Sequence, residues 1–185
     1  MPTLDLAAFG AGKISYADLT GELNFSDLRA LTDELYTTIH AIISSSTDAD
    51  VSFVPHDLAA KDTNEQGWTL SHVIAHLTAT AEESAVTAAL LAKGVTPEGR
   101  LRYETPWETL QTAQQVLSRL QESQRMCNAY LDAWPDAPQL DVTLVRVPHF
   151  GPLNAIRMYV LGYLHGTSHI EQVREIMRQA GQSRS

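Results

Sequence analysis

Hydrophobic residues recur along most of this chain at alternating spacings of three and four, the pattern typical of helices that bury one face. In one stretch the repeat consists of Leu28, Leu31, Leu35, Ile39 and Ile42. A later stretch continues it from Leu110 to Trp134, with Gln124 as the single polar residue on that face. The pattern predicts an all-α fold with four long helices, at about residues 26–46, 69–93, 106–134 and 152–180.

Capping signals indicate where these helices begin and end. Residues 105–108 read Thr-Pro-Trp-Glu, which combines an N-cap threonine, a proline at the first helical position and a glutamate three residues after the cap. Gly94 stands where a glycine is expected just past a helix end. Residues 1–23 show only a weak pattern, so we expect a lead-in there and a single helical domain over residues 1–185.

The connections between the four predicted helices are long, short and long in turn. A short link joins antiparallel neighbours, whereas a long link permits parallel ones, so the pattern predicts an up-up-down-down four-helix bundle. The second and fourth helices are then antiparallel. In the last connection, residues 140–147 alternate in polarity and are rich in β-branched side chains, which predicts a short strand or hairpin there.

Composition and charge narrow the classes of function. The chain has 185 residues, of which 44% are hydrophobic and 19% charged, a balance typical of a globular protein. Its 22 acidic and 13 basic residues give a formal net charge of −9, which argues against nucleic acid or an anionic membrane as a partner. Neither a signal peptide nor a membrane-spanning run is recognisable. With Cys127 as the only cysteine, we expect a cytoplasmic protein without internal disulfides that acts on a small molecule.

Two histidines in the fourth predicted helix, His165 and His169, are the strongest candidates for metal ligands. Residues four apart lie on one helical face about 5–6 Å from each other, so their imidazoles can converge on one ion. His76, in the second predicted helix, is the best third ligand. In an antiparallel pair of helices its depth falls within about a turn or two of the other histidines. The alternative is three core or interface histidines that are hydrogen-bonded to their neighbours.

Other polar residues are weaker candidates for a functional role. Glu83 lies seven residues after His76, on the same helical face, and is a candidate acid–base residue; a structural or solvated acid is the alternative. Gln172, almost one turn after His169, is a candidate for positioning a water or for a dimer contact, against a plain hydrogen bond at the edge of the core. His72 lies in the first turn of its helix, where a capping or surface role is more usual.

The two histidine segments resemble motifs of a known family. Gly-Trp-Thr at residues 67–69, followed by His76, looks like the second-helix motif of the DinB/YfiT-like family. His165-x-x-x-His169-x-x-Gln172 resembles the fourth-helix motif of that family. The likeness covers the four predicted helices, and these two motifs are its specific part.

What the resemblance implies is a four-helix bundle, often a homodimer, with a divalent metal held by three histidines and at least one coordination position open. The metal is commonly zinc or nickel. Relatives include thiol-dependent S-transferases and isomerases that use low-molecular-weight thiols, and proteins described as metal-dependent hydrolases. This chain departs from the family pattern in one respect. Many members carry an acidic residue two or three positions after the second-helix histidine, where this chain has Thr78 and Ala79, and its nearest acids are Glu82 and Glu83.

These observations leave three hypotheses for function. The first is a metal-dependent hydrolase or thiol S-transferase that acts on a small electrophile, with a low-molecular-weight thiol as a candidate cosubstrate. The second is a stress-related bundle that binds metal without turnover, which the absence of an acid next to His76 favours. The third is a metal-free helical dimer.

Overall fold

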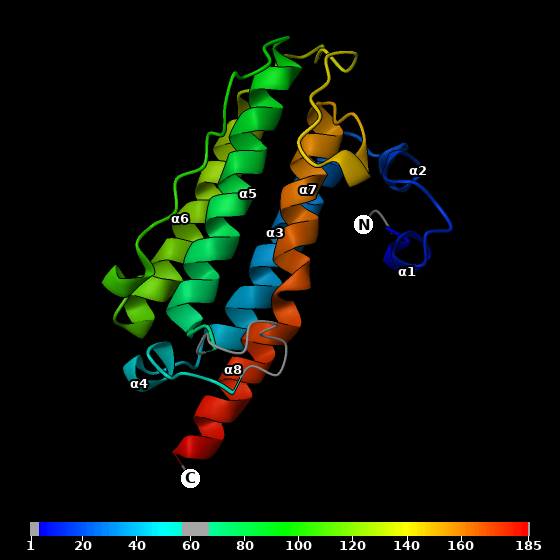
Figure 1. Cartoon of the computed structure of the whole chain (residues 1–185). Helices are drawn as coiled ribbons and strands as arrows, with labels where there is room; N and C mark the ends of the chain where they lie inside the picture. The colour runs from blue at the N-terminus through cyan, green and yellow to red at the C-terminus, as the bar shows by residue number, and fades with distance from the viewer. Residues whose placement is uncertain (1–3, 57–66, 185) are drawn as a thin grey trace.

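The computed structural model describes residues 4–56 and 67–184, and within these ranges helices are the only extended regular elements (Figure 1). The predicted all-α fold is therefore confirmed. None of the described helices combines the length and the apolar character needed to cross a membrane. The elements are α1 (Leu6–Gly10), α2 (Tyr16–Thr20), α3 (Phe25–Ile43), α4 (Asp48–Val51), α5 (Leu70–Ala92), the 3-10 turn η1 (Trp107–Thr109), α6 (Ala113–Asp132), the 3-10 turn η2 (Pro148–Phe150), α7 (Ala155–Ser168) and α8 (Ile170–Ser183).

The bundle consists of α3, α5, α6 and the rod that α7 and α8 form together (Figure 1). α5 packs against α6 and α7, and α3 packs against the same two helices. The interior between them is filled by aliphatic side chains that are fully buried, among them Leu28, Ile39, Leu77 and Leu120. Burial of this kind supplies most of the stability of such a bundle, because each fully buried leucine or isoleucine contributes about 1.5–3 kcal/mol.

The directions of the helices differ from the predicted up-up-down-down order. α3 is antiparallel to α6, since Arg29 pairs with Asp132 near one end and the Tyr36 hydroxyl bonds Ser123 further along. α5 and α6 run in the same direction, and α7 returns along the direction of α3, which gives an up-down-down-up order (Figure 1). The prediction treated the α5–α6 link as too short to run back along a helix. An extended chain covers roughly 3.3 Å per residue against 1.5 Å in a helix, so residues 93–112 are long enough to do so.

The third predicted helix begins later than its first capping signal. The Thr-Pro pair at residues 105–106 starts only the short turn η1, and α6 begins after Thr112. The Gln115 N–H donates to the Thr112 hydroxyl (3.2 Å), and the Thr112 N–H donates to the Gln115 side chain (3.0 Å). This capping box provides two reciprocal bonds, which η1 lacks, and it therefore sets the start of the helix.

The fourth predicted helix is divided at His169, whose backbone has φ −93° and ψ −6°. The two residues before it carry hydroxyls that donate to the carbonyls three residues earlier: Thr167 to Leu164 (2.8 Å) and Ser168 to His165 (2.7 Å). Such bonds compete with the backbone ladder and commonly bend or interrupt a helix. The break places His169 at the junction of α7 and α8.

The strand predicted within residues 140–147 is reduced to a single bridge. Leu144 and Leu153 exchange two backbone hydrogen bonds of 2.9 Å, and no strand is present in the described ranges. The bridge holds the α6–α7 connection against the start of α7, with η2 at its tip.

Cys127 lies in the α3–α6 interface, 3% exposed, beside the hydroxyls of Tyr36 and Ser123. Burial raises the pKa of its thiol to about 11, and hydrogen bonds offset that rise only in part. We expect iodoacetamide to alkylate the native protein at least about 100-fold more slowly at about pH 8 than the unfolded chain, because few thiols are ionised or accessible. The rate should increase about tenfold per pH unit below the pKa. Equal rates before and after unfolding in guanidinium, measured by mass spectrometry, would contradict this assignment.

Candidate metal centre

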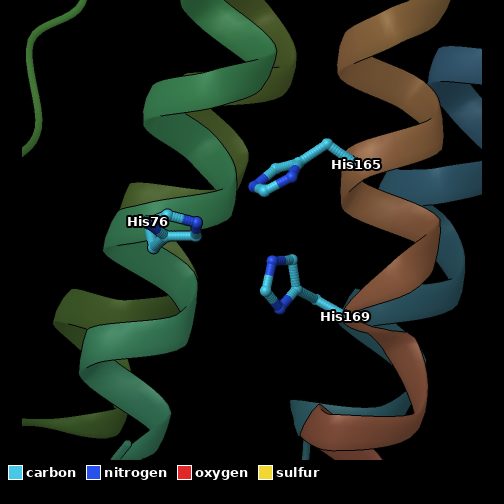
Figure 2. Close-up of side chains that lie close together, drawn as sticks. All are labelled: His76, His165 and His169. Atoms are coloured by element: carbon cyan, nitrogen blue, oxygen red, sulfur yellow. The ribbon is translucent and has the colours of Figure 1, made fainter. Parts of the chain in front are cut away.

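The three histidines named from the sequence lie together in the structure. His76 projects from α5, His165 from α7 and His169 from the α7–α8 junction (Figure 2). One nitrogen from each ring lies within 4.8 Å of the corresponding nitrogen of the other two. Ring centroids are 4.9 Å apart for His76 and His165, 5.3 Å for His76 and His169, and 4.7 Å for His165 and His169. Residues about ninety positions apart in the chain are thus brought to one point, because α5 and α7 are antiparallel, as predicted.

Two glycines of α7 allow this helix to approach its neighbours closely. A Cβ atom on Gly162 would lie 2.8 Å from Cβ of Ser84 and 3.1 Å from Cα of Ala81, both on α5. A Cβ atom on Gly166 would lie 2.6 Å from a methyl carbon of Leu35 on α3. Gly162 is the glycine that faces α5, where a Cβ atom would meet backbone, so it sets the distance across which His165 faces His76, while Gly166 permits the approach of α7 to α3.

Burial keeps two of the imidazoles neutral. Desolvation, helped by the positive charge of Arg102 and by the neighbouring histidines, lowers the pKa of His76 to about 4. Desolvation and the other two histidines lower the pKa of His165 to about 3. Both rings therefore present unprotonated nitrogens near neutral pH, the state in which histidine binds metals.

His165 has a buried nitrogen that no described residue satisfies. Its Nε2 atom is shielded from solvent and has no hydrogen-bond partner within residues 4–56 and 67–184. An unpartnered buried polar atom costs about 1–3 kcal/mol, so such atoms are rare unless they serve a purpose. A cation shared with the other two rings would satisfy this atom, and three imidazoles are a donor set that zinc, nickel and copper accept. The residues present therefore fit a metal ion.

Two residues that the sequence reasoning missed hold the ring of His76. Its Nδ1 atom lies 3.2 Å from Nη2 of Arg102 and 3.7 Å from a carboxylate oxygen of Glu104, and Arg102 and Glu104 also pair with each other. Because a guanidinium only donates, Nδ1 is the acceptor in its contact with Arg102, and Glu104 lies too far from the ring for a hydrogen bond and acts on it through its negative charge. The sequence does contain a signal for these residues, because charged side chains recur at every second position. Arg100, Arg102 and Glu104 therefore fall on one side of an extended segment, and this segment runs beside α5.

We expect Glu104→Gln to weaken metal binding about 10–100-fold, because the amide cannot stabilise positive charge on the His76 ring as a carboxylate does. The dissociation constant for zinc can be measured by competition with a chromophoric chelator. Glu108→Gln, an exposed residue of η1 on the same connection, is the matched control and should leave zinc affinity unchanged. Equal affinity in Glu104→Gln and wild type would show that Glu104 does not support the ligand.

Gln172 contacts the site through His169. Its side-chain oxygen lies 2.8 Å from His169 Nδ1. Because an amide oxygen only accepts, Nδ1–H of His169 is the donor in this contact, and Nε2 is the ring nitrogen that Gln172 does not engage. Gln172 is thus placed to orient a candidate ligand, and its predicted role with a water or in a dimer contact stays a prediction.

Glu83, the other predicted catalytic residue, is held by arginines rather than by the histidines. It is 4% exposed, and its carboxylate accepts hydrogen bonds from Nε (3.0 Å) and Nη2 (2.5 Å) of Arg100, with Nη2 of Arg146 at 3.6 Å. Desolvation alone would raise the pKa of Glu83, but the Arg100 hydrogen bonds and the charges of both arginines outweigh it and lower the pKa. A role for Glu83 in proton transfer stays a prediction.

The remaining residues near the motif have structural partners. Glu82 pairs with Arg119 of α6. His72 is stacked between two indoles, with ring centroids 4.2 Å from Trp68 and 5.1 Å from Trp107. It belongs to an aromatic stack beside the three candidate metal ligands and is not one of the histidines that are grouped there.

The chain matches the model of a known protein family. A family model described as the DinB superfamily matches residues 17–173, from α2 to the first turn of α8, and so includes all three histidines. No curated protein and no solved structure matches the chain significantly. Because the family model covers well over half of the sequence and both histidine motifs, the chain belongs to the DinB superfamily.

Proposed function

We propose that this protein is a metal-dependent enzyme in which His76, His165 and His169 hold one divalent ion, with zinc and nickel as the leading candidates. Two observations carry the proposal together: one nitrogen from each of the three rings lies within 4.8 Å of the others, and Nε2 of His165 is buried without a hydrogen-bond partner among the described residues. The DinB superfamily match is compatible with metal binding.

The arrangement favours a reactive centre over a closed structural one. Three protein ligands with a further position open are typical of catalytic sites, whereas structural sites usually have four protein ligands. A bound divalent ion would supply Lewis acidity and lower the pKa of a water or a thiol at the open position. The protein supplies neutral imidazoles, and Arg102, Glu104 and Gln172 orient two of the three rings.

Space for a substrate lies beside the site. A cavity of about 640 Å³ is lined by His165 and Glu83 together with apolar side chains of α1, α7 and η2. Volumes of this size accommodate small organic molecules. We therefore propose a hydrolase or a thiol S-transferase that acts on a small molecule, with a low-molecular-weight thiol as a candidate cosubstrate. The family resemblance supports a homodimer, and the single cysteine supports a cytoplasmic location.

A second function, metal binding without turnover, is favoured by the acids nearest His76. Glu82 is paired with Arg119, and Glu83 is paired with Arg100 and Arg146, so neither is placed as an unpaired base beside the histidines. Catalysis would then need a base other than these two, or none.

Metal analysis followed by activity assays tests both functions. Protein prepared without a histidine tag should contain about one divalent ion per chain by mass spectrometry. Panels of thiols and electrophiles, and of ester and amide substrates, are then assayed with zinc or nickel and after chelation. Metal-dependent turnover would support the enzyme and reject the inert bundle. Stoichiometric metal without turnover would support the second function, and a protein that binds no divalent ion would refute both.

A further inference from the structure

Apolar walls surround the cavity beside the histidines on most sides. Leu6 and Phe9 of α1, Phe150 of η2, and Met158, Leu161 and Leu164 of α7 line it. The rings of Phe9 and Phe150 stack with centroids 6.0 Å apart, so the lead-in segment packs against the α6–α7 connection at this cavity. Such walls favour a ligand with an apolar body.

The cavity is lined by few charged groups, and their positive and negative charges do not cancel. The lining contains two arginines, Arg100 and Arg146, and a single acid, Glu83. Arg100 binds both oxygens of the Glu83 carboxylate by hydrogen bonds from Nε and Nη2, whereas Arg146 interacts with this carboxylate only through its charge. One positive charge in excess therefore remains among the described residues that line the cavity.

Arg146 carries that excess charge, and one edge of its guanidinium group, formed by Nε and Nη2, has no hydrogen-bond partner among the described residues. Its Nε and Nη2 atoms are buried, and neither is hydrogen-bonded to any residue within the described ranges. The nearest acid oxygen, on Glu83, lies 3.6 Å from Nη2, close enough for attraction but too far for a hydrogen bond. Buried guanidinium N–H groups without partners are costly, so an acceptor that reached this edge would be bound favourably.

The neighbouring arginine shows which acceptor fits this edge. In Arg100 the same two atoms, Nε and Nη2, bind the two oxygens of one carboxylate. Two parallel N–H groups match the two oxygens of a carboxylate, and a single excess positive charge matches its single negative charge. A neutral ligand would leave both N–H groups of Arg146 poorly satisfied.

We propose that the cavity binds a small substrate with an apolar body and a carboxylate, and that Arg146 binds that carboxylate through Nε and Nη2. The inference rests on the proposed function and deepens it, because Arg146 and His165 line the same cavity. Arg146 is then a residue that determines specificity for the substrate.

A matched pair of probes tests the proposal by binding, without any assay of activity. Phenylbutyrate and its neutral amide, phenylbutyramide, are titrated by calorimetry into wild type, Arg146→Gln and Arg174→Gln. Arg174 is the control, since it is an exposed arginine of α8 paired with Glu171 and lies outside the cavity. We expect wild type and the control to bind the carboxylate at least about tenfold more tightly than the amide. In Arg146→Gln that preference should fall below about threefold.

The titrations are made first on metal-free protein and then with zinc, so that the result does not depend on the proposed metal function. An Arg146-dependent preference without metal supports the inference whether or not zinc binds. A preference that appears only with zinc, or that persists in Arg146→Gln, would place the carboxylate elsewhere and overturn it. Equal affinity for the two probes, or no binding of either, would also overturn it. Arg146→Lys keeps the charge but not the paired N–H groups, and should retain only part of the preference, with folding checked by circular dichroism.

Discussion

We expect the His165→Ala variant to lose its divalent ion and, with it, the stabilisation that the ion gives to the folded chain. A ligand that binds only the folded state raises the free energy of unfolding by about 2.7 kcal/mol when its free concentration is about one hundred times its dissociation constant. Wild-type protein should therefore show a clear rise in melting temperature on addition of zinc. The variant should show none, because two remaining imidazoles cannot replace the third ligand.

The metal-free variant should be about as stable as metal-free wild type. Removing the imidazole loses packing, but it also removes a buried nitrogen that has no hydrogen-bond partner, and the two effects oppose each other within about 1–3 kcal/mol. His40→Ala, at an exposed histidine of α3, is the control for loss of a histidine as such and should keep both the ion and the zinc-dependent shift. Full metal retention in His165→Ala would show that the trio is not the binding site.

The ligand histidines could be predicted because their signals are local. His165 and His169 have the i,i+4 spacing, and His76 follows a motif at a fixed distance. Their convergence then required only that two long amphipathic helices be antiparallel. The all-α fold was predictable for the same reason, since its helices carry sustained periodicity that tertiary contacts reinforce.

What could not be predicted depends on residues whose partners are distant in the chain. The alternation of charged residues at positions 100, 102 and 104 indicates an extended segment but not which helix it lies beside, so its return along α5 was missed, and with it the helix order and the roles of Arg102 and Glu104. Gln124, the single polar residue on its helical face, donates its amide to Asp33 of α3 (3.0 Å). A polar residue on a helix seam does not reveal which neighbour will satisfy it.

The second large effect expected concerns Gly162, which lies three residues before His165 in α7. In Gly162→Ala the new methyl group would meet the backbone of Ala81 at 3.1 Å as well as the side chain of Ser84, so a rotamer change alone cannot relieve the clash. Overpacking of this kind costs about 1–3 kcal/mol. It would also push α7 away from α5, and therefore separate His165 from His76. We expect a lower free energy of unfolding in urea together with weaker zinc binding.

Gly181→Ala is the matched control, because the same substitution should raise the stability of the protein at that position instead of lowering it. Gly181 lies inside α8, and a Cβ atom there would meet only the end of a flexible arginine side chain, 3.9 Å away. Alanine is favoured over glycine within helices by up to about 1 kcal/mol, so this variant should be slightly more stable and should bind zinc as wild type does. If Gly162→Ala were stabilised to the same extent, the close approach of α7 to α5 would not constrain the site. A loss of stability without any loss of zinc affinity would show that the histidines adjust independently of the distance between the two helices.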